Sequence, residues 1–131
     1  MARSITTFLM FEGLAEEAMT LYVSVFRAST VRRVERWTAG EQGRTGSIKR
    51  AEFSVGGHEI IALDSPIAHD FTFTPAMSLF VECEEEAELD AVYAQLSAGG
   101  QVLMPPDNYG FSRKFAWLND RFGVSWQLNL V

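Results

Sequence analysis

The side chains best suited to chemistry are few and widely spaced in this sequence. The two histidines, His58 and His69, fall in segments that the pattern indicates are turns or loops, so they do not converge from several elements as metal ligands do. The single cysteine, Cys83, has no histidine near it in sequence. Ser125 stands in Gly-Val-Ser-Trp and lacks the Gly-x-Ser-x-Gly turn. We therefore predict solvent-exposed histidines, a structural thiol and no serine nucleophile.

Charged residues favour neither a built anion site nor a nucleic-acid partner. Arg32, Arg33 and Arg36 form a small basic cluster that could bind an anionic ligand. Glu35 interrupts the cluster on a strand expected to be exposed, which favours a solvated, salt-bridged surface instead. The chain carries a formal net charge of −6 at pH 7, so a phosphate backbone would repel it.

Length and composition predict a single soluble domain. The chain has 131 residues, of which 47% are hydrophobic, and its ten Phe and three Trp supply a large apolar surface for burial. One cysteine cannot form an internal disulfide and suits a reducing compartment. The apolar run after residues 1–4 is too short for a signal peptide or a membrane span. We therefore predict one cytoplasmic domain over residues 1–131, with no membrane partner.

Periodicity in the first half predicts the order strand, helix, strand, strand, strand. From Leu14 to Val25 apolar residues recur at helical spacing, whereas the flanking segments show strand character. Gly56-Gly57 is typical of a hairpin turn, and three glycines in residues 38–46 indicate a mobile loop. The expected strands span residues 5–11, 31–37, 48–55 and 59–64.

The second half repeats this order after a crossing loop. A helix is expected from residue 84, and Gly99-Gly100 is typical of its carboxyl-terminal cap. Pro105-Pro106 indicates a loop. The expected strands span residues 77–83, 102–104, 111–118 and 124–131. Since neither half covers its apolar sheet face alone, we predict an α+β fold. In it, two βαβββ modules, residues 4–66 and 75–131, form one cupped mixed sheet with the helices outside.

Three stretches of sequence resemble a known family. They are Phe8 to Tyr22, with Phe-Leu-Met-Phe-Glu-Gly-Leu-Ala-Glu-Glu-Ala-Met; Phe73 to Val81; and Asp120 to Gln127, with Asp-Arg-Phe-Gly-Val-Ser-Trp-Gln. The chain resembles PhnB-like proteins, often labelled 3-demethylubiquinone-9 3-methyltransferase. Their vicinal-oxygen-chelate superfamily includes glyoxalase I, extradiol dioxygenases and bleomycin-resistance proteins. The resemblance implies paired βαβββ modules around a cupped sheet, in a homodimer whose cups are bordered by both subunits.

The resemblance also implies where metal-dependent relatives hold a divalent ion inside the cup. By strand pattern those positions fall near Thr6, Ala62, Ala76 and Gln127. None is a histidine or a carboxylate, and two alanines offer no ligand atom in their side chains. We therefore expect neither a bound metal nor another cofactor.

Strand parity relative to these positions predicts a small-molecule site. If Ala62 faces the cup, Asp64 does too, because side chains alternate along a strand. It could then act as a general base or as a hydrogen-bond acceptor. Alternatively, Asp64 caps the turn before Pro66. Gln127 keeps hydrogen-bonding capacity where relatives place a Glu ligand. Hydroxyl groups and aromatic rings would line the rest of the cavity. Ordinary core packing is the alternative explanation of the same pattern. The predicted ligand-binding residues are Thr6, Phe8, Asp64, Ser78, Phe80 and Gln127.

Three functions stay open at this point. The first is metal-independent binding of a small, partly apolar molecule, including sequestration of the resistance type. The second is a metal-dependent lyase or dioxygenase of the superfamily. The third is methyl transfer, as the family label suggests, although the glycine pairs fit a hairpin and a helix cap better than a nucleotide loop.

The high aromatic content for a chain of this size predicts self-association. Trp117 and Trp126 lie on sheet faces that a domain of this size does not fully cover. The strand at residues 31–37 ends in a tryptophan beside the glycine-rich loop. We therefore expect a homodimer, the commonest soluble oligomer, with the loop at residues 38–46 acting as a lid over a cup.

Overall fold

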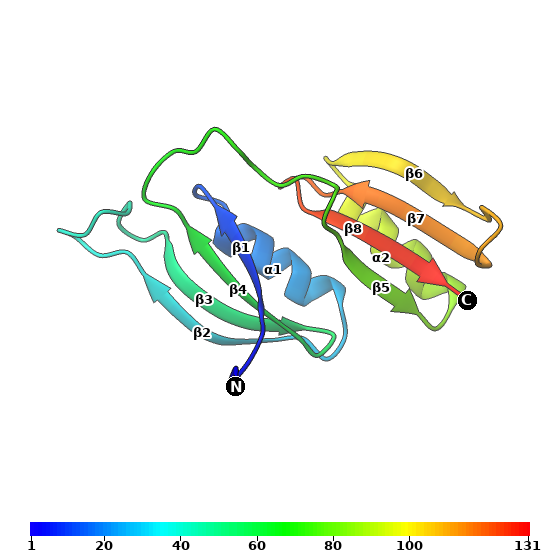
Figure 1. Ribbon diagram of the computed structural model, residues 1–131, viewed down its shortest axis with the longest axis horizontal. Helices are drawn as coiled ribbons and strands as arrows, with labels where there is room; N and C mark the ends of the chain where they lie inside the picture. The colour runs from blue at the N-terminus through cyan, green and yellow to red at the C-terminus, as the bar shows by residue number, and fades with distance from the viewer. The chain divides into compact units, whose positions relative to one another are not determined.

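A computed structural model describes residues 1–131 as two compact units, Met1–His69 and Asp70–Val131 (Figure 1). We call them the first and second modules. The first contains β1 (Thr7–Phe11), α1 (Ala15–Val25), β2 (Thr30–Arg36), β3 (Ile48–Val55) and β4 (His58–Asp64). The second contains β5 (Leu79–Cys83), α2 (Glu86–Ser97), β6 (Gln101–Asp107), β7 (Lys114–Asn119) and β8 (Ser125–Leu130). The predicted βαβββ order is confirmed in both.

The two modules share one sheet topology. Their strand orders are β1-β4-β3-β2 and β5-β8-β7-β6, each a four-stranded mixed sheet. In each, the first and last strands of the module pair in parallel, whereas the remaining pairs are antiparallel. This agreement confirms the α+β class and the internal repeat. The joining of the two sheets into one cup stays a prediction.

One face of each sheet packs against the helix of its own module. In the first module the buried helix residues are Ala15, Ala18, Met19 and Tyr22, and the buried strand residues include Leu9, Phe11, Ala51, Phe53, Ile60 and Ala62. In the second, Leu89, Val92 and Leu96 of α2 are buried, as are Ala116, Leu118, Trp126, Leu128 and Leu130. Full burial of each large apolar side chain stabilises the fold by about 1.5–3 kcal/mol. Neither helix has the length and apolar character that a membrane crossing requires.

The opposite face of each sheet, which we call the helix-free face, carries the other half of the strand residues. Because side chains alternate along a strand, the residues between those that face the helix belong to this face. In the second module they are Ser78, Phe80, Glu82, Phe115, Trp117, Asn119, Ser125, Gln127 and Asn129. Paired strands bring these residues into one continuous patch.

Strand β6 is longer than expected and includes Pro105 and Pro106. The prediction of a loop at these two residues is wrong. Strand β6 lies at the edge of its sheet and its pairing with β7 contains register shifts. An edge strand tolerates proline because no neighbour needs its missing N–H on the outer side.

The glycine-rich loop at residues 38–46 is folded onto Trp37. The Trp37 N–H donates to the Ser47 carbonyl at 2.9 Å, and Gly46 N–H donates to the Trp37 carbonyl at 2.9 Å. Gly43 is buried so closely that an added Cβ would lie 2.2 Å from the indole ring. Lys49 Nζ lies 5.2 Å from the centre of the same ring. The loop expected to be mobile is therefore held by contacts within its own module.

Candidate functional site

Asp64 has different surroundings from those expected. It is 3% exposed, and its Oδ1 accepts hydrogen bonds from the backbone N–H groups of Gly13 at 2.8 Å and Ala15 at 3.0 Å. Its Oδ2 accepts one from the N–H of Ile48 at 2.9 Å. Ala62, two residues earlier, is fully buried on the side of α1. This arrangement corrects the expectation that Asp64 presents its carboxylate to a ligand. The residue satisfies the start of α1 and ties it to β3 and β4.

Asp120 is the buried aspartate of the second module, in the turn between β7 and β8. It is 3% exposed, and its Oδ1 accepts from the N–H groups of Phe122 at 2.9 Å and Val124 at 3.0 Å. Its Oδ2 accepts from Trp126 Nε1–H at 2.9 Å. An aspartate at the start of a turn between two strands is a sequence signal for such a role. The sequence does not show that Trp126 is its partner.

Two serines and an amide form a hydrogen-bonded chain on the helix-free face of the second module. Ser78 Oγ and Ser125 Oγ lie 2.7 Å apart, and Gln127 Nε2–H donates to Ser78 Oγ at 3.2 Å. Trp117 Nε1–H donates to Ser125 Oγ at 2.9 Å. Phe80 is the register partner of Gln127 across β5 and β8. Three of the predicted residues, Ser78, Phe80 and Gln127, are thus neighbours.

Counting protons shows what this chain offers a ligand. Each serine hydroxyl carries one proton and can accept two hydrogen bonds. Trp117 donates to Ser125 Oγ and Gln127 donates to Ser78 Oγ, so neither bond uses a serine proton. The contact between the two hydroxyls uses one of the two serine protons. One hydroxyl proton and the Gln127 Oε1 acceptor remain. Because Ser125 is 2% exposed whereas Ser78 is half-buried, Ser78 is the accessible hydroxyl. The arrangement can orient a polar group, but it contains no base that would make a serine nucleophilic.

Asn129 continues the polar row toward Glu82. Its Nδ2–H donates to Glu82 Oε2 at 3.0 Å. A carboxylate only accepts hydrogen bonds, which fixes the orientation of the amide. The other amide atom, Asn129 Oδ1, is buried without a hydrogen-bond partner, and the residue is 7% exposed. Sequence reasoning missed both residues, although Asn129 lies two positions after Gln127 and shares its face.

Aromatic rings lie beside this polar row. Phe115 is 5% exposed and pairs in register with Asn129. Its ring centre lies 6.5 Å from that of Phe80, 5.0 Å from Phe111 and 6.3 Å from Tyr109. Phe80 and Phe111 remain 54% and 64% exposed. The helix-free face therefore combines apolar rings with a few hydrogen-bonding groups, as small-molecule sites do.

The remaining predicted residues belong to the first module. Phe8 is 55% exposed on the helix-free side of β1, and Thr6 directly precedes that strand. Their part in ligand binding stays a prediction. Both histidines have hydrogen-bond partners within the first module: His58 Nε2 lies 2.9 Å from Thr7 Oγ1, and His69 Nε2 lies 2.7 Å from Ser65 Oγ. His58 begins β4, where it is exposed as expected, whereas His69 is half-buried.

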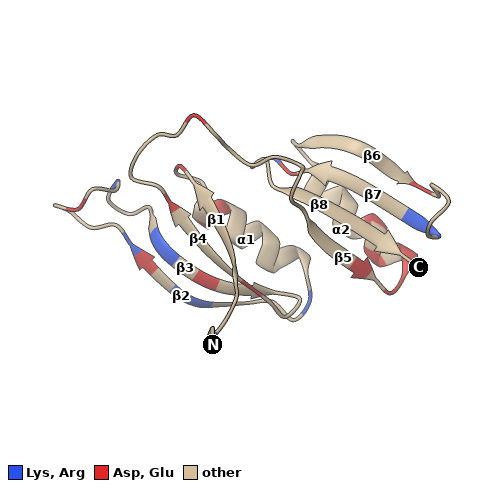
Figure 2. Ribbon diagram, in the orientation of Figure 1, with Lys and Arg blue, Asp and Glu red and all other residues tan.

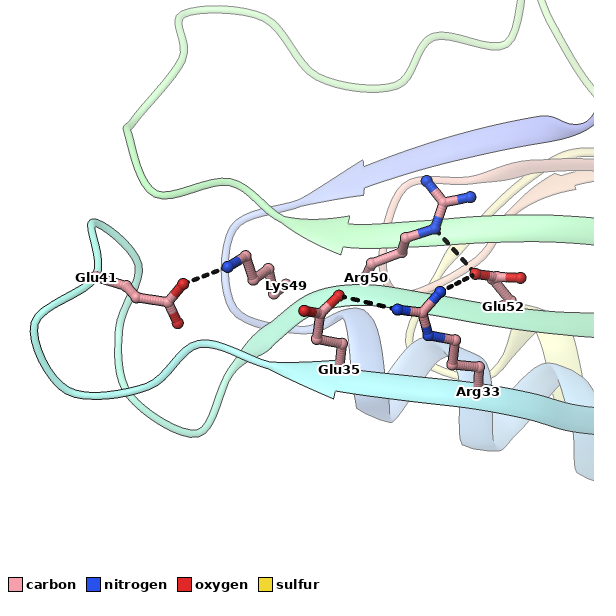
Figure 3. Close-up of polar contacts among 6 residues, drawn as sticks. All are labelled: Arg33, Glu35, Glu41, Lys49, Arg50 and Glu52. Atoms are coloured by element: carbon pink, nitrogen blue, oxygen red, sulfur yellow. Dashed lines mark hydrogen bonds and ion pairs between the residues drawn. The ribbon is translucent and has the colours of Figure 1, made fainter.

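The arginine cluster of β2 is paired with glutamates, as predicted for a salt-bridged surface. Arg33 lies 3.4 Å from Glu52, which also accepts from Arg50 at 3.0 Å (Figure 3). Arg50 lowers the pKa of Glu52, chiefly through this hydrogen bond. The other pairs are Arg32 with Glu59, Arg33 with Glu35, Arg36 with Glu16, and Lys49 with Glu41. This surface offers no unpaired arginine from the cluster to an anion.

Cys83 is a buried free thiol at the end of β5. Burial, with smaller contributions from the charges of Glu88 and Glu82, raises its pKa to about 11. Since the thiolate is the reactive form, this thiol is inert near neutral pH. The structure supports the prediction of a structural thiol.

The residues at the implied metal positions do not fit a divalent ion. Ala62 packs on the side of α1, Ala76 offers only a methyl group, and Gln127 is engaged with Ser78. No group of three or more His, Cys, Asp or Glu side chains is arranged to hold a metal. Hard cations require converging oxygen or imidazole ligands, which this donor set does not supply.

Solved structures share this architecture. A PhnB protein from Bacillus cereus, described as a 3-demethylubiquinone-9 3-methyltransferase, is 50% identical, with 98% of this chain and 100% of that chain covered and a TM-score of 0.96. Protein PA1353 from Pseudomonas aeruginosa is 24% identical over 98% of both chains, with a TM-score of 0.85. The fosfomycin resistance protein FosX from Listeria monocytogenes, complexed with Mn(II) and a dihydroxypropylphosphonic acid, shares the fold at 12% identity. The match covers 98% of this chain and 93% of that one, with a TM-score of 0.65.

A comparison with family models identifies the family. No curated protein matches the chain. A model described as 3-demethylubiquinone-9 3-methyltransferase matches residues 3–129, which is nearly the whole sequence. The chain therefore belongs to the PhnB-like family that carries this description, and its fold is that of the vicinal-oxygen-chelate superfamily.

Proposed function

We propose that this protein binds a small, partly apolar molecule without a bound metal, using the helix-free face of the second module. The observation that carries the proposal is the hydrogen-bonded chain of Ser78, Ser125 and Gln127 beside the exposed ring of Phe80. Buried polar groups with spare hydrogen-bonding capacity, next to apolar rings, give a ligand both contact area and orientation.

The direct test is a nuclear magnetic resonance titration with 2-phenylethanol, a neutral probe with one ring and one hydroxyl. The amide signals of β5 and β8 should shift, and Ser78→Ala should weaken the binding. Ser24→Ala is the matched control, because Ser24 is an exposed serine on α1 that bonds only the Leu21 carbonyl. Shifts confined to the first module, or no saturable shifts, would overturn the proposed site.

Metal analysis tests the second part of the proposal. Protein purified without a histidine tag should contain far less than one equivalent of nickel, zinc, iron or manganese. Tight, stoichiometric metal would instead favour a metal-dependent enzyme of the superfamily. Calorimetry with adenosylmethionine tests the methyl transfer that the family description names, and we expect no heat of binding.

We also infer a homodimer that acts in the cytoplasm. Large apolar side chains are exposed between the last strand of the first module and β5: Ile67 is 63%, Phe71 61% and Met77 73% exposed. A second copy of the chain would bury them, and a stable interface buries roughly 2,000 Å². The single Cys83 suits a reducing compartment. Sedimentation equilibrium at micromolar concentration should give twice the 14.6 kDa mass of one chain; a monomer would overturn the dimer.

A further inference from the structure

The charge of the chain is distributed unequally between the two modules. The first contains eight Lys and Arg and eight Asp and Glu, so its formal charge is zero. The second contains three Lys and Arg and nine Asp and Glu, so it carries the entire net charge of −6. Figure 2 shows the acidic residues gathered at the start of α2 and the end of β5. Any ligand of the second module meets a negative field.

Two of the three cations of the second module are directed elsewhere. Lys114 Nζ lies 2.8 Å from Asp90 and 3.6 Å from Glu86, both on α2, so it belongs to the helix side of the sheet. The Arg121 guanidinium lies 4.6 Å from the ring centre of Phe122 in the turn before β8. No strand residue of the helix-free face is a lysine or an arginine. Arg113 is exposed just before β7, so the strands of this face themselves offer an anionic ligand no cation.

Hydrogen-bond acceptors dominate the end of the face near Glu82. The Glu82 carboxylate is exposed, and Asn129 holds it through one amide proton while its own Oδ1 lacks a partner. A buried acceptor without a donor costs about 1–3 kcal/mol, which a ligand that supplies the donor would recover. The rings of Phe80 and Phe115 lie beside these acceptors, and aromatic faces attract cations.

We propose that the ligand of this face is a small aromatic or apolar molecule that carries a protonated amine, recognised by Glu82, Asn129 and the adjacent phenylalanine rings. The inference rests on the proposed function, since it names the chemical class that the same face binds. The ammonium group would donate to the Glu82 carboxylate and to Asn129 Oδ1. The apolar part would lie against Phe80.

Three probes of similar size but different charge test whether the site binds at all and which charge it prefers. They are phenethylamine, 2-phenylethanol and 3-phenylpropionate. In titrations at neutral pH followed by nuclear magnetic resonance, the amine should bind about fivefold or more tightly than the alcohol, and the carboxylate most weakly. Glu82→Gln should reduce the amine to the affinity of the alcohol. Glu85→Gln, an equal charge change at an exposed residue before α2, should leave the preference intact.

The outcomes distinguish the two proposals. If none of the probes binds, both the proposed function and the ligand class fail. If the alcohol or the carboxylate binds as tightly as the amine, only the ligand class fails. The same conclusion follows if Glu82→Gln retains the preference. Should Glu82→Gln not fold, the salt dependence in the unaltered protein decides, because added NaCl should reduce the affinity for the amine and not for the alcohol.

Discussion

The two modules have the same topology but different helix-free faces. In the first module this face carries arginines and glutamates that neutralise each other on β2 and β3 (Figure 3). In the second it carries serines, amides and aromatic rings around an unpaired carbonyl oxygen. The repeat keeps what the fold requires, a helix on one face of the sheet. The other face differs between the modules, and that of the second module is the one on which we propose a ligand site.

The buried aspartates differ in the range of their contacts. Asp64 joins residues 51, 49 and 16 positions away, which belong to three separate segments of the first module. The hydrogen bonds that Asp120 accepts from Phe122, Val124 and Trp126 come from residues two, four and six positions away. A long-range carboxylate stabilises tertiary structure, whereas a local one stabilises a turn.

Substitution of Asp64 should have the largest effect on stability. Asp64→Asn replaces one acceptor oxygen by a donor facing a backbone N–H, so we expect a loss of about 2–4 kcal/mol in the free energy of unfolding. Asp120→Asn should cost less, about 1–2 kcal/mol, because a local turn can readjust. Urea denaturation measures both. Equal losses would show that the range of the contacts does not matter.

Two glycines in tight contacts provide the next comparison. An added Cβ at Gly100 would lie 2.2 Å from the backbone oxygen of Asn119, whereas one at Gly43 would meet the side chain of Trp37. The backbone at Gly100 cannot move aside, whereas the Trp37 ring can shift only by straining its hydrogen bond to the Asp64 carbonyl, so Gly100→Ala should cost about 2–3 kcal/mol and Gly43→Ala about 1–2 kcal/mol. Urea midpoints give the order, and a change of tryptophan fluorescence should accompany Gly43→Ala alone.

Ser78→Ala should affect binding and not stability. The residue lies half-buried and supplies a hydroxyl with hydrogen-bonding capacity to spare. Loss of one ligand hydrogen bond should weaken binding of 2-phenylethanol about three- to tenfold. A melting temperature within a degree or two of the parent would separate this result from a folding defect. An unchanged affinity would remove Ser78 from the site.

The buried thiol predicts a pH dependence. The pKa of Cys83 is raised in the folded state to about 11 from 9.0, so folding favours the protonated thiol. Its contribution to stability is therefore complete below pH 9 and is lost as the pH rises toward 11. Cys83→Ala should lack this loss in urea titrations across that range. Iodoacetamide should also label the native thiol far more slowly at pH 8 than the unfolded one.

The salt-bridged face of the first module should matter least. Glu52 is half-buried at the surface, and its pKa is lowered by Arg50 through a hydrogen bond that water and salt screen. Glu52→Gln should leave the urea midpoint nearly unchanged, and 0.5 M NaCl should not alter that result. A large loss would mean that the arginines and glutamates act as a coupled network.

The sequence by itself determined the order of the elements and the family. The change from period two to helical spacing after Gly13, the hairpin glycines Gly56-Gly57 and the apolar segment 48–55 all correspond to elements of the structure. These features are local, since they depend on backbone conformation and on which residues avoid water. Strand parity, taken relative to the metal positions of the resembled family, also grouped Ser78, Phe80 and Gln127, and these residues are neighbours in the structure.

Only the tertiary structure decided which face each group of residues occupies. Parity placed Asp64 and Ala62 together, but the position of α1 shows that both lie on the helix side. Likewise, Pro105 and Pro106 are compatible with a strand only because β6 lies at an edge. The unpaired Asn129 Oδ1 depends on the exact partner of its amide group. Alternation specifies that two faces differ; contacts between distant segments determine which one is buried and which one is left to bind a ligand.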